Sequence, residues 1–177
     1  MEIKASSKYD WETVKSFYIF SFSKKHRWPS IVLIVVFLLL LATYVLEAVN
    51  GTFSADLLPS MAMFITLYIA MGFVRFVLPK IQYNKNKLIH GIENIITFGE
   101  QKFEINQNGD NATGTASISY DAIQKIYETK EYIYIYISPQ QAHIVDKATI
   151  TGGSLNDLRA LLSNAVGMSK YKLKCKV

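Results

Sequence analysis

The sequence predicts an α+β membrane protein, in which a two-helix transmembrane hairpin precedes a cytoplasmic antiparallel sheet or barrel that ends in a helix. Three observations predict this class: two long apolar runs in the first half, short strand-like segments in the second half, and a capped amphipathic helix after them. Half of the 177 residues are hydrophobic. Because these residues are segregated along the chain, one soluble core does not explain them.

Residues 1–29 are predicted to form a cytoplasmic leader. Asp10 is a suitable N-cap, and an apolar stripe follows it at helical spacing, formed by Trp11, Val14, Tyr18 and Phe22. We expect an amphipathic helix that lies in the membrane interface. The alternating aromatics of "YIFSF" leave an extended segment open as the alternative, and "MEIKA" is compatible with a short strand.

Residues 30–78 are predicted to form the transmembrane hairpin, with spans at about 30–49 and 57–78. Each run is long enough to cross a hydrocarbon core of about 30 Å at 1.5 Å per residue. Arg75 is near enough to the end of its span to reach the headgroups. The link "NGTFSAD" is short, so the two helices are expected to run antiparallel.

The basic residues predict the orientation of this hairpin. Lys24, Lys25 and Arg27 precede the first span, Lys80 and further lysines follow the second, and the link contains no Lys or Arg. The positive-inside rule therefore predicts a multi-pass protein of the cell membrane with both termini in the cytoplasm. The three basic residues before the first span are also candidate contacts for anionic lipids.

Residues 79–177 are predicted to form the cytoplasmic domain. "NIITFGEQKFEIN" predicts a hairpin that turns at Gly99, and "NQNGDN" is a dense turn cluster. Further strand-like segments are "TGTASISYDAIQKIYET", "EYIYIYIS" and "AHIVDKATI". A helix follows, with a capping box at Ser154 and Asp157, a leucine-rich stripe and a stop at Gly167.

The segment "EYIYIYIS" alternates two kinds of side chain. In a strand, Ile133, Ile135 and Ile137 share one face, which we expect to pack under the helix that begins at Ser154. The other face, expected to be the outer one, carries Tyr132, Tyr134 and Tyr136. Cross-strand aromatic pairing explains these tyrosines, and the functional alternative is that they dock a partner protein.

The order of these features resembles the YcxB-like family of small bacterial membrane proteins. The best local match is "EYIYIYISPQQAHIVDKATI", a hydrophobic ribbon, a turn and a strand that leads to Lys147. Asp146 and Ile150 stand where the pattern has a proline and an aromatic residue. The resemblance implies a C-terminal domain with a bacterial pleckstrin-homology-type fold, and it brings no established activity.

The tail "KYKLKCKV" places alternate lysines on one side of an extended chain: Lys170, Lys172, Lys174 and Lys176. Two compatible interpretations remain open. The tail is an additional strand with an edge protected by lysines, or it contacts anionic lipid.

The sequence contains little that indicates catalysis. The single cysteine, Cys175, excludes an intrachain disulfide, and His26, His90 and His143 lack a metal-ligand spacing. No phosphate-binding loop, nucleophile elbow or zinc-protease motif is present. We therefore expect no enzyme, no cofactor and no metal. An enzyme remains the third hypothesis, and it requires a concave pocket with convergent polar groups around His90, His143 or nearby carboxylates.

The net charge of +5 is explained by membrane topology and the tail, so nucleic acid is not an expected partner. The leading hypothesis is a membrane-anchored, non-enzymatic interaction module that engages lipid headgroups or a membrane or cytoplasmic protein. The alternative is an accessory subunit of a transporter or of an antimicrobial-peptide immunity system that acts through its helices. The sequence leaves a homo-oligomer open.

Overall fold

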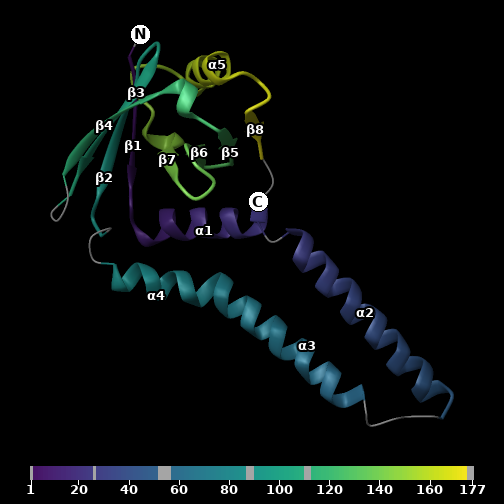
Figure 1. Cartoon of the computed structure of the whole chain (residues 1–177). Helices are drawn as coiled ribbons and strands as arrows, with labels where there is room; N and C mark the ends of the chain where they lie inside the picture. Colours follow the sequence, from purple (N-terminus) through teal and green to yellow (C-terminus); the bar gives the residue numbers. More distant parts are fainter. Residues whose placement is uncertain (1, 26, 52–56, 87–89, 110–112, 175–177) are drawn as a thin grey trace. The chain divides into compact units, whose positions relative to one another are not determined.

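The computed structural model describes residues 2–25, 27–51, 57–86, 90–109 and 113–174 (Figure 1). The chain divides into two compact units, one formed by Met1–Phe17 with Lys85–Val177 and the other by Tyr18–Asn84. The first unit therefore includes part of the leader, which the sequence had set apart from the C-terminal domain. The reason is that the predicted N-terminal strand forms and pairs in a sheet with residues about ninety positions later.

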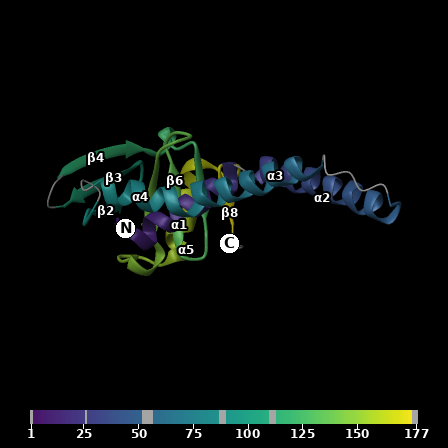
Figure 2. The same cartoon turned by 90° about the horizontal axis from the view of Figure 1, so that it is seen from below.

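The first unit contains two four-stranded sheets. The N-terminal sheet is antiparallel and has the order β1-β2-β3-β4, where the strands are β1 (Ile3–Lys8), β2 (Glu93–Phe98), β3 (Lys102–Asn108) and β4 (Gly114–Ser119). β2 and β3 form the hairpin predicted around Gly99. Figure 2 shows β4 at the edge of this sheet.

The C-terminal sheet has the order β7-β6-β5-β8. Its strands are β5 (Lys125–Glu128), β6 (Tyr132–Tyr136), β7 (Ala142–Asp146) and β8 (Tyr171–Leu173). β5, β6 and β7 are antiparallel, whereas β8 pairs parallel to β5. The predicted strand in the tail is therefore confirmed, and it forms the edge of the sheet.

The 3₁₀ turn η3 (Lys147–Thr149) joins the two sheets at β1. Thr149 Oγ1 accepts a hydrogen bond from Ser6 N at 2.9 Å and donates one to Ser6 O at 2.7 Å. Lys4 and Thr151 form an isolated antiparallel bridge beside it. The N-terminal strand is thus held on both of its sides.

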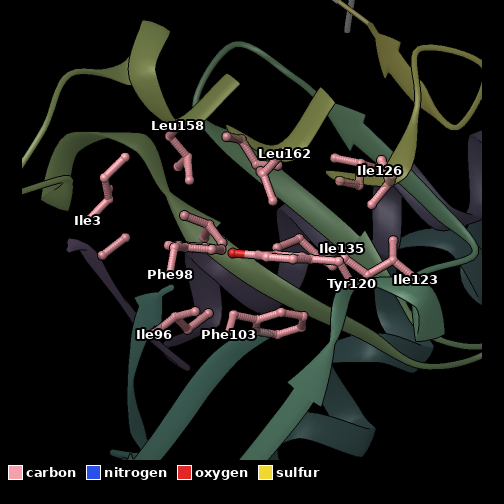
Figure 3. Packing of buried hydrophobic residues seen from close by; sticks show 14 of the residues in the cluster. Ile3, Ile96, Phe98, Phe103, Tyr120, Ile123, Ile126, Ile135, Leu158 and Leu162 are labelled. Carbon is pink, nitrogen blue, oxygen red and sulfur yellow. The ribbon is translucent and has the colours of Figure 1, made fainter. Parts of the chain in front are cut away.

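Helix α5 (Leu155–Val166) begins and ends where the sequence predicts. Ser154 and Asp157 form the capping box, and the chain leaves the helix at Gly167 with φ of +82°. Leu158 and Leu162 are fully buried and pack with residues of both sheets in one core (Figure 3). This core includes Ile133 and Ile135 as expected, whereas Ile137 follows the end of β6 and is only partly buried. Burial of these side chains is the main stabilising contribution to the unit.

Helix α1 (Trp11–Lys25) confirms the helical alternative for the leader. Asp10 caps it, because its Oδ1 accepts a hydrogen bond from Thr13 N at 2.8 Å. The first half of the helix belongs to the α+β unit, where Thr13 and Val14 are buried.

The second unit contains the two apolar helices. They are α2 (Arg27–Val49), and α3 (Leu57–Gly72), which continues through the π-helical segment η1 (Phe73–Val77) into α4 (Leu78–Lys85). Two contacts show that α2 and α3 run antiparallel. Ser30 Oγ lies 3.7 Å from Met71 Sδ, and the rings of Phe37 and Tyr68 are 6.1 Å apart.

Arg75 lies in η1 and has partners within this unit. Its guanidinium donates to Ser23 Oγ at 3.2 Å and lies 5.7 Å from the ring centre of Phe22 and 5.3 Å from that of Phe76. The contacts with Ser23 and Phe22 join η1 to the second half of α1.

Candidate functional site

The inner face of the N-terminal sheet changes from large apolar to small polar side chains along the strands. The strand register produces three rows across β1 to β4. The first row is Ile3, Phe98, Phe103 and Ile118, the second is Ala5, Ile96, Ile105 and Ala116, and the third is Ser7, Asn94, Gln107 and Gly114. The first row and most of the second belong to the core, whereas Ala116 at the end of the second row is exposed. The third row lies at the end of the sheet away from α5.

A cleft of about 470 Å³ lies at this polar end. Its walls come from β2, β3, β4 and the beginning of β7. The polar lining residues are Tyr9, Asn94, Gln107, Thr115, Gln141 and His143, and the aliphatic ones include Ile92 and Ile105. The cleft therefore combines an apolar wall with several neutral hydrogen-bonding groups, a composition typical of small-molecule sites.

Asn94 is the most buried polar residue of this lining, with 6% of its surface exposed. Its side chain hydrogen-bonds Tyr9, whose pKa is raised by burial and lowered to a smaller extent by this bond. Within the described part of the chain, Asn94 Oδ1 has no hydrogen-bond partner, and neither has the hydroxyl of Ser7, its neighbour across the strand pair. Buried polar atoms without partners are uncommon in folded proteins.

His143 lies on β7, and its side chain points toward the N-terminal sheet. Its ring lies edge-on to Phe103, with 6.1 Å between the ring centres. Burial lowers its pKa, so the imidazole is neutral at pH 7, and its Nε2 is a further buried atom without a partner among the described residues. In the sequence analysis, His143 was considered as a metal ligand, for which no suitable spacing was found, and as one of the residues around which an enzyme would need a pocket. The signal that was missed is its place in a strand, two residues before the fully buried Val145.

This lining gathers neutral hydrogen-bonding groups around His143, which is the kind of pocket that the enzyme hypothesis requires. Among the described lining residues, none is Asp, Glu, Lys, Arg or Cys, so His143 has no carboxylate there to orient it. No group of three or more His, Cys, Asp or Glu that could hold a metal ion occurs in the parts of the chain that the structure describes.

A second polar cluster surrounds Glu128 at the end of β5. This carboxylate is fully buried and accepts hydrogen bonds from Arg159 of α5, Lys147 of η3 and Tyr171 of β8. Arg159 Nε lies 2.9 Å from Oε2, Lys147 Nζ lies 2.7 Å from Oε1, and Tyr171 Oη lies 2.7 Å from Oε2. One side chain therefore connects three elements to the centre of the C-terminal sheet.

The partners of Glu128 decide its protonation. Burial by itself raises the pKa of this carboxyl, but the hydrogen bonds from Arg159, Lys147 and Tyr171 outweigh burial and lower the pKa to about 2. Lys147 also donates to the backbone oxygens of Thr129 and Lys130, so its ammonium is well satisfied. The charged cluster therefore holds α5, η3 and β8 against β5. This cluster was not identified in the sequence analysis. The available signal was that Glu128 lies two residues after Ile126, on the same face of the strand, and that Ile126 is buried.

The tyrosine face of β6 is covered by the chain's own helix α1. Tyr134 is 1% exposed and Tyr136 is 4% exposed. The ring of Phe17 lies 5.5 Å from Tyr134 and 6.3 Å from Tyr136, and the hydroxyls of Thr13 and Tyr132 are 3.5 Å apart. The sequence had placed these tyrosines on an outer face. The structure instead buries both faces of β6, since α1 occupies the second face.

Cross-strand pairing also contributes to this layer. Tyr134 lies directly opposite Tyr127 of β5, and Tyr136 packs edge-on against Tyr127 with ring centres 5.6 Å apart. The aromatic pairing expected from the sequence is therefore present, within a second apolar layer between α1 and the sheet.

The basic residues of the predicted lipid contacts differ in their surroundings. Lys24, Lys172 and Lys174 are exposed, whereas Lys170 is half-buried and its ammonium donates to Ile123 O at 3.0 Å. Lys172 lies on the edge strand β8, in agreement with the expected lysine-protected edge. The side chains of Lys25 and Arg27, and the whole of Lys176 and Cys175, lie outside the described residues.

Fold and site together define an α+β protein with two long apolar helices, a polar cleft and a buried carboxylate cluster. The model of the YcxB-like protein family matches residues 98–162. This match confirms the resemblance over the segment from the end of β2 to α5, which contains Glu128, Lys147, Arg159 and His143. No curated protein and no solved structure matches the chain.

Proposed function

We propose that this chain is a membrane-anchored, non-enzymatic interaction module, in which the helical hairpin holds the α+β unit at the inner leaflet. The observation that carries the proposal is the surface of the two apolar helices. They offer segments of 20 residues (Ser30–Val49) and 25 residues (Met61–Lys85), and none of the residues in their most apolar stretch is buried. A helix of 20 residues is about 30 Å long, which equals the hydrocarbon thickness.

The large apolar side chains on these helices support the same proposal. Leu39 is 62% exposed and Ile69 is 68% exposed, and many neighbouring residues are similar. An apolar surface of this extent is unfavourable in water and favourable in lipid. Lysines lie before the first helix and at the end of the second, which are the ends that the chain connects to the α+β unit. By the positive-inside rule, this supports a cytoplasmic location for these ends.

The α+β unit is proposed to be a pleckstrin-homology-type module. Two four-stranded sheets around one core, followed by a C-terminal amphipathic helix, agree with the fold that the family resemblance implies. Because α1 covers the tyrosine face, the surfaces left for a protein or a lipid headgroup include the cleft and two exposed lysines, Lys172 of β8 and Lys174 just after it. Each lysine near an anionic leaflet contributes on the order of 1 kcal/mol to binding.

Thiol labelling in intact cells tests the membrane topology. Cys175 is the native cysteine, and a second variant combines Asn50→Cys with Cys175→Ser to place one thiol beside the interhelical link. A membrane-impermeant maleimide should label the Asn50→Cys variant in intact cells and Cys175 only after permeabilisation. Labelling of Cys175 in intact cells, or release of the chain by alkaline carbonate, would contradict the proposal.

Replacement of both helices by an unrelated hairpin tests which part carries the function. Photo-crosslinkers at the exposed positions Thr115 and Lys172 would capture partners in native membranes, with identification by mass spectrometry. If the α+β unit is the interaction module, the same crosslinked products persist after the exchange. Their loss, with the protein still in the membrane, would assign the interaction to the helices and so to an accessory-subunit role.

A further inference from the structure

The third row of the N-terminal sheet is chemically unlike the two rows beside it. Asn94 and Ser7 occupy inward positions that the same strands fill with Ile96, Phe98 and Ile3 in the other rows. Apolar residues would suit these positions as well, because the strand geometry is the same. A polar residue that is buried and lacks a partner destabilises the unit. A hydrogen-bond partner for Ser7 Oγ and Asn94 Oδ1 would therefore come from outside the described residues.

Three buried polar atoms in this part of the unit come from three different strands. They are Ser7 Oγ of β1, Asn94 Oδ1 of β2 and His143 Nε2 of β7, each without a hydrogen-bond partner among the described residues. Asn94 and His143 both line the cleft. Its volume of about 470 Å³ lies within the range of small-molecule sites.

We propose that this cleft binds a small uncharged ligand that has an apolar body and an N–H donor, of the kind a primary or secondary amide provides. The N–H would donate to Asn94 Oδ1, and the ligand's carbonyl would accept from the imidazole of His143. The apolar body would lie against Ile92 and Ile105. This inference goes beyond the proposed membrane role and does not depend on it.

The chemistry of the lining excludes the other ligand classes. A charged ligand would lose its hydration without gaining an opposite charge, because the described lining contains no Asp, Glu, Lys or Arg and His143 is neutral. A purely apolar ligand would leave Asn94 Oδ1 and His143 Nε2 without partners. An uncharged amide satisfies both atoms and retains the apolar contact.

Three probes of similar size and shape separate these classes: benzamide, benzoate and toluene. The full chain, in detergent micelles and with isotope-labelled histidine, is titrated with each probe while the imidazole resonances are followed by NMR. His26 and His90 provide internal references. We expect benzamide to shift the His143 resonances with the highest affinity, and benzoate and toluene to bind about tenfold more weakly or not at all.

Asn94→Leu removes the unpartnered oxygen and keeps the volume, and Asn106→Leu is the matched control. Asn106 is exposed and lies on β3, on the face of the sheet opposite to the face that carries Asn94. The proposal expects benzamide affinity to fall about tenfold in Asn94→Leu and to stay unchanged in Asn106→Leu. Ala116→Leu provides a second test, since it narrows the cleft without removing a polar group. It should also weaken benzamide binding.

The outcomes are decisive in either direction. Preferential binding of benzamide that both cleft variants weaken supports the proposal. Equal affinity for the three probes, a preference for benzoate or toluene, binding of none of them at the solubility limit, or equal affinity in Ala116→Leu and wild type would overturn it. Should Asn94→Leu fail to fold, as judged by hydrogen exchange, the Ala116→Leu result decides.

Discussion

The carboxylate of Glu128 offers the sharpest test of how this fold is held together. Glu128→Gln keeps the size of the side chain and removes its charge. In the structure, Arg159, Lys147 and Tyr171 all donate to this one buried group. The substitution should therefore destabilise the α+β unit strongly, because two cations then lose the charge that compensates them.

The magnitude follows from the pKa of Glu128. The pKa falls from 4.5 to about 2 in the folded state. At about 1.4 kcal/mol per pKa unit, this difference corresponds to roughly 3 kcal/mol of stability at pH 7. Breaking a buried ion pair by removing one partner typically costs about 3–5 kcal/mol, so the two estimates agree.

Hydrogen exchange of the β5 and β6 amides, measured in urea on the full chain in detergent micelles, gives the required free energies of unfolding. Glu104→Gln is the matched control. Glu104 also forms an ion pair, with 3.0 Å between its Oε1 and Lys102 Nζ, but both side chains are more than half exposed. A surface pair of this kind contributes about 0–1 kcal/mol. The two variants should therefore differ by about 2 kcal/mol or more.

The pH dependence provides an independent check. Because the folded pKa of Glu128 is lowered, its contribution is complete above pH 4.5 and is lost as the pH falls towards about 2. The stability difference between wild type and Glu128→Gln should shrink to about 1 kcal/mol at pH 3. A difference that is constant from pH 7 to pH 3, or equal losses in Glu128→Gln and Glu104→Gln, would refute this reasoning.

Three further substitutions test other parts of the structure, each followed by urea unfolding or hydrogen exchange of the full chain. Tyr134→Ala should cost about 3–5 kcal/mol because the ring is buried under α1, and a loss below about 1 kcal/mol would mean that this face is open. Ser154→Ala should cost about 1 kcal/mol and speed exchange in the first turn of α5, since it removes the capping box; unchanged exchange there would contradict the cap. Gly152→Ala should cost about 2 kcal/mol or more, because φ is +74° and the new Cβ would lie 2.3 Å from Glu2 O. Gly114→Ala, where a Cβ meets open space, is its control and should be nearly neutral, so equal losses would exclude the steric explanation.

Local patterns predicted many elements of this fold correctly. The capping box of α5, the turn at Gly99 and the N-cap at Asp10 depend on residues within a few positions of one another, and all three form as expected. The apolar runs predicted two long helices in the same way. For such features the interacting atoms are neighbours along the chain, so the sequence contains both partners.

The candidate site could not be found in this way. The cleft brings together Tyr9, Asn94, Thr115 and His143, which are separated by up to about 130 positions. The polar row becomes visible only when the strand register places Ser7 opposite Asn94 and Asn94 opposite Gln107. Alternation within one strand cannot supply that register, because it depends on which strands are neighbours.

The sequence by itself determined the two apolar helices, the strand-rich second half, the capped helix α5 and the faces of β6 that isoleucine and tyrosine occupy. The tertiary structure alone decided what covers those faces and where buried charge is compensated. Alternation separates Ile135 from Tyr134, but α1, more than a hundred residues earlier, buries the tyrosine face. Glu128 likewise acquires its partners from η3, α5 and β8. Burial and electrostatics depend on distances in space, and chain separation does not fix those distances.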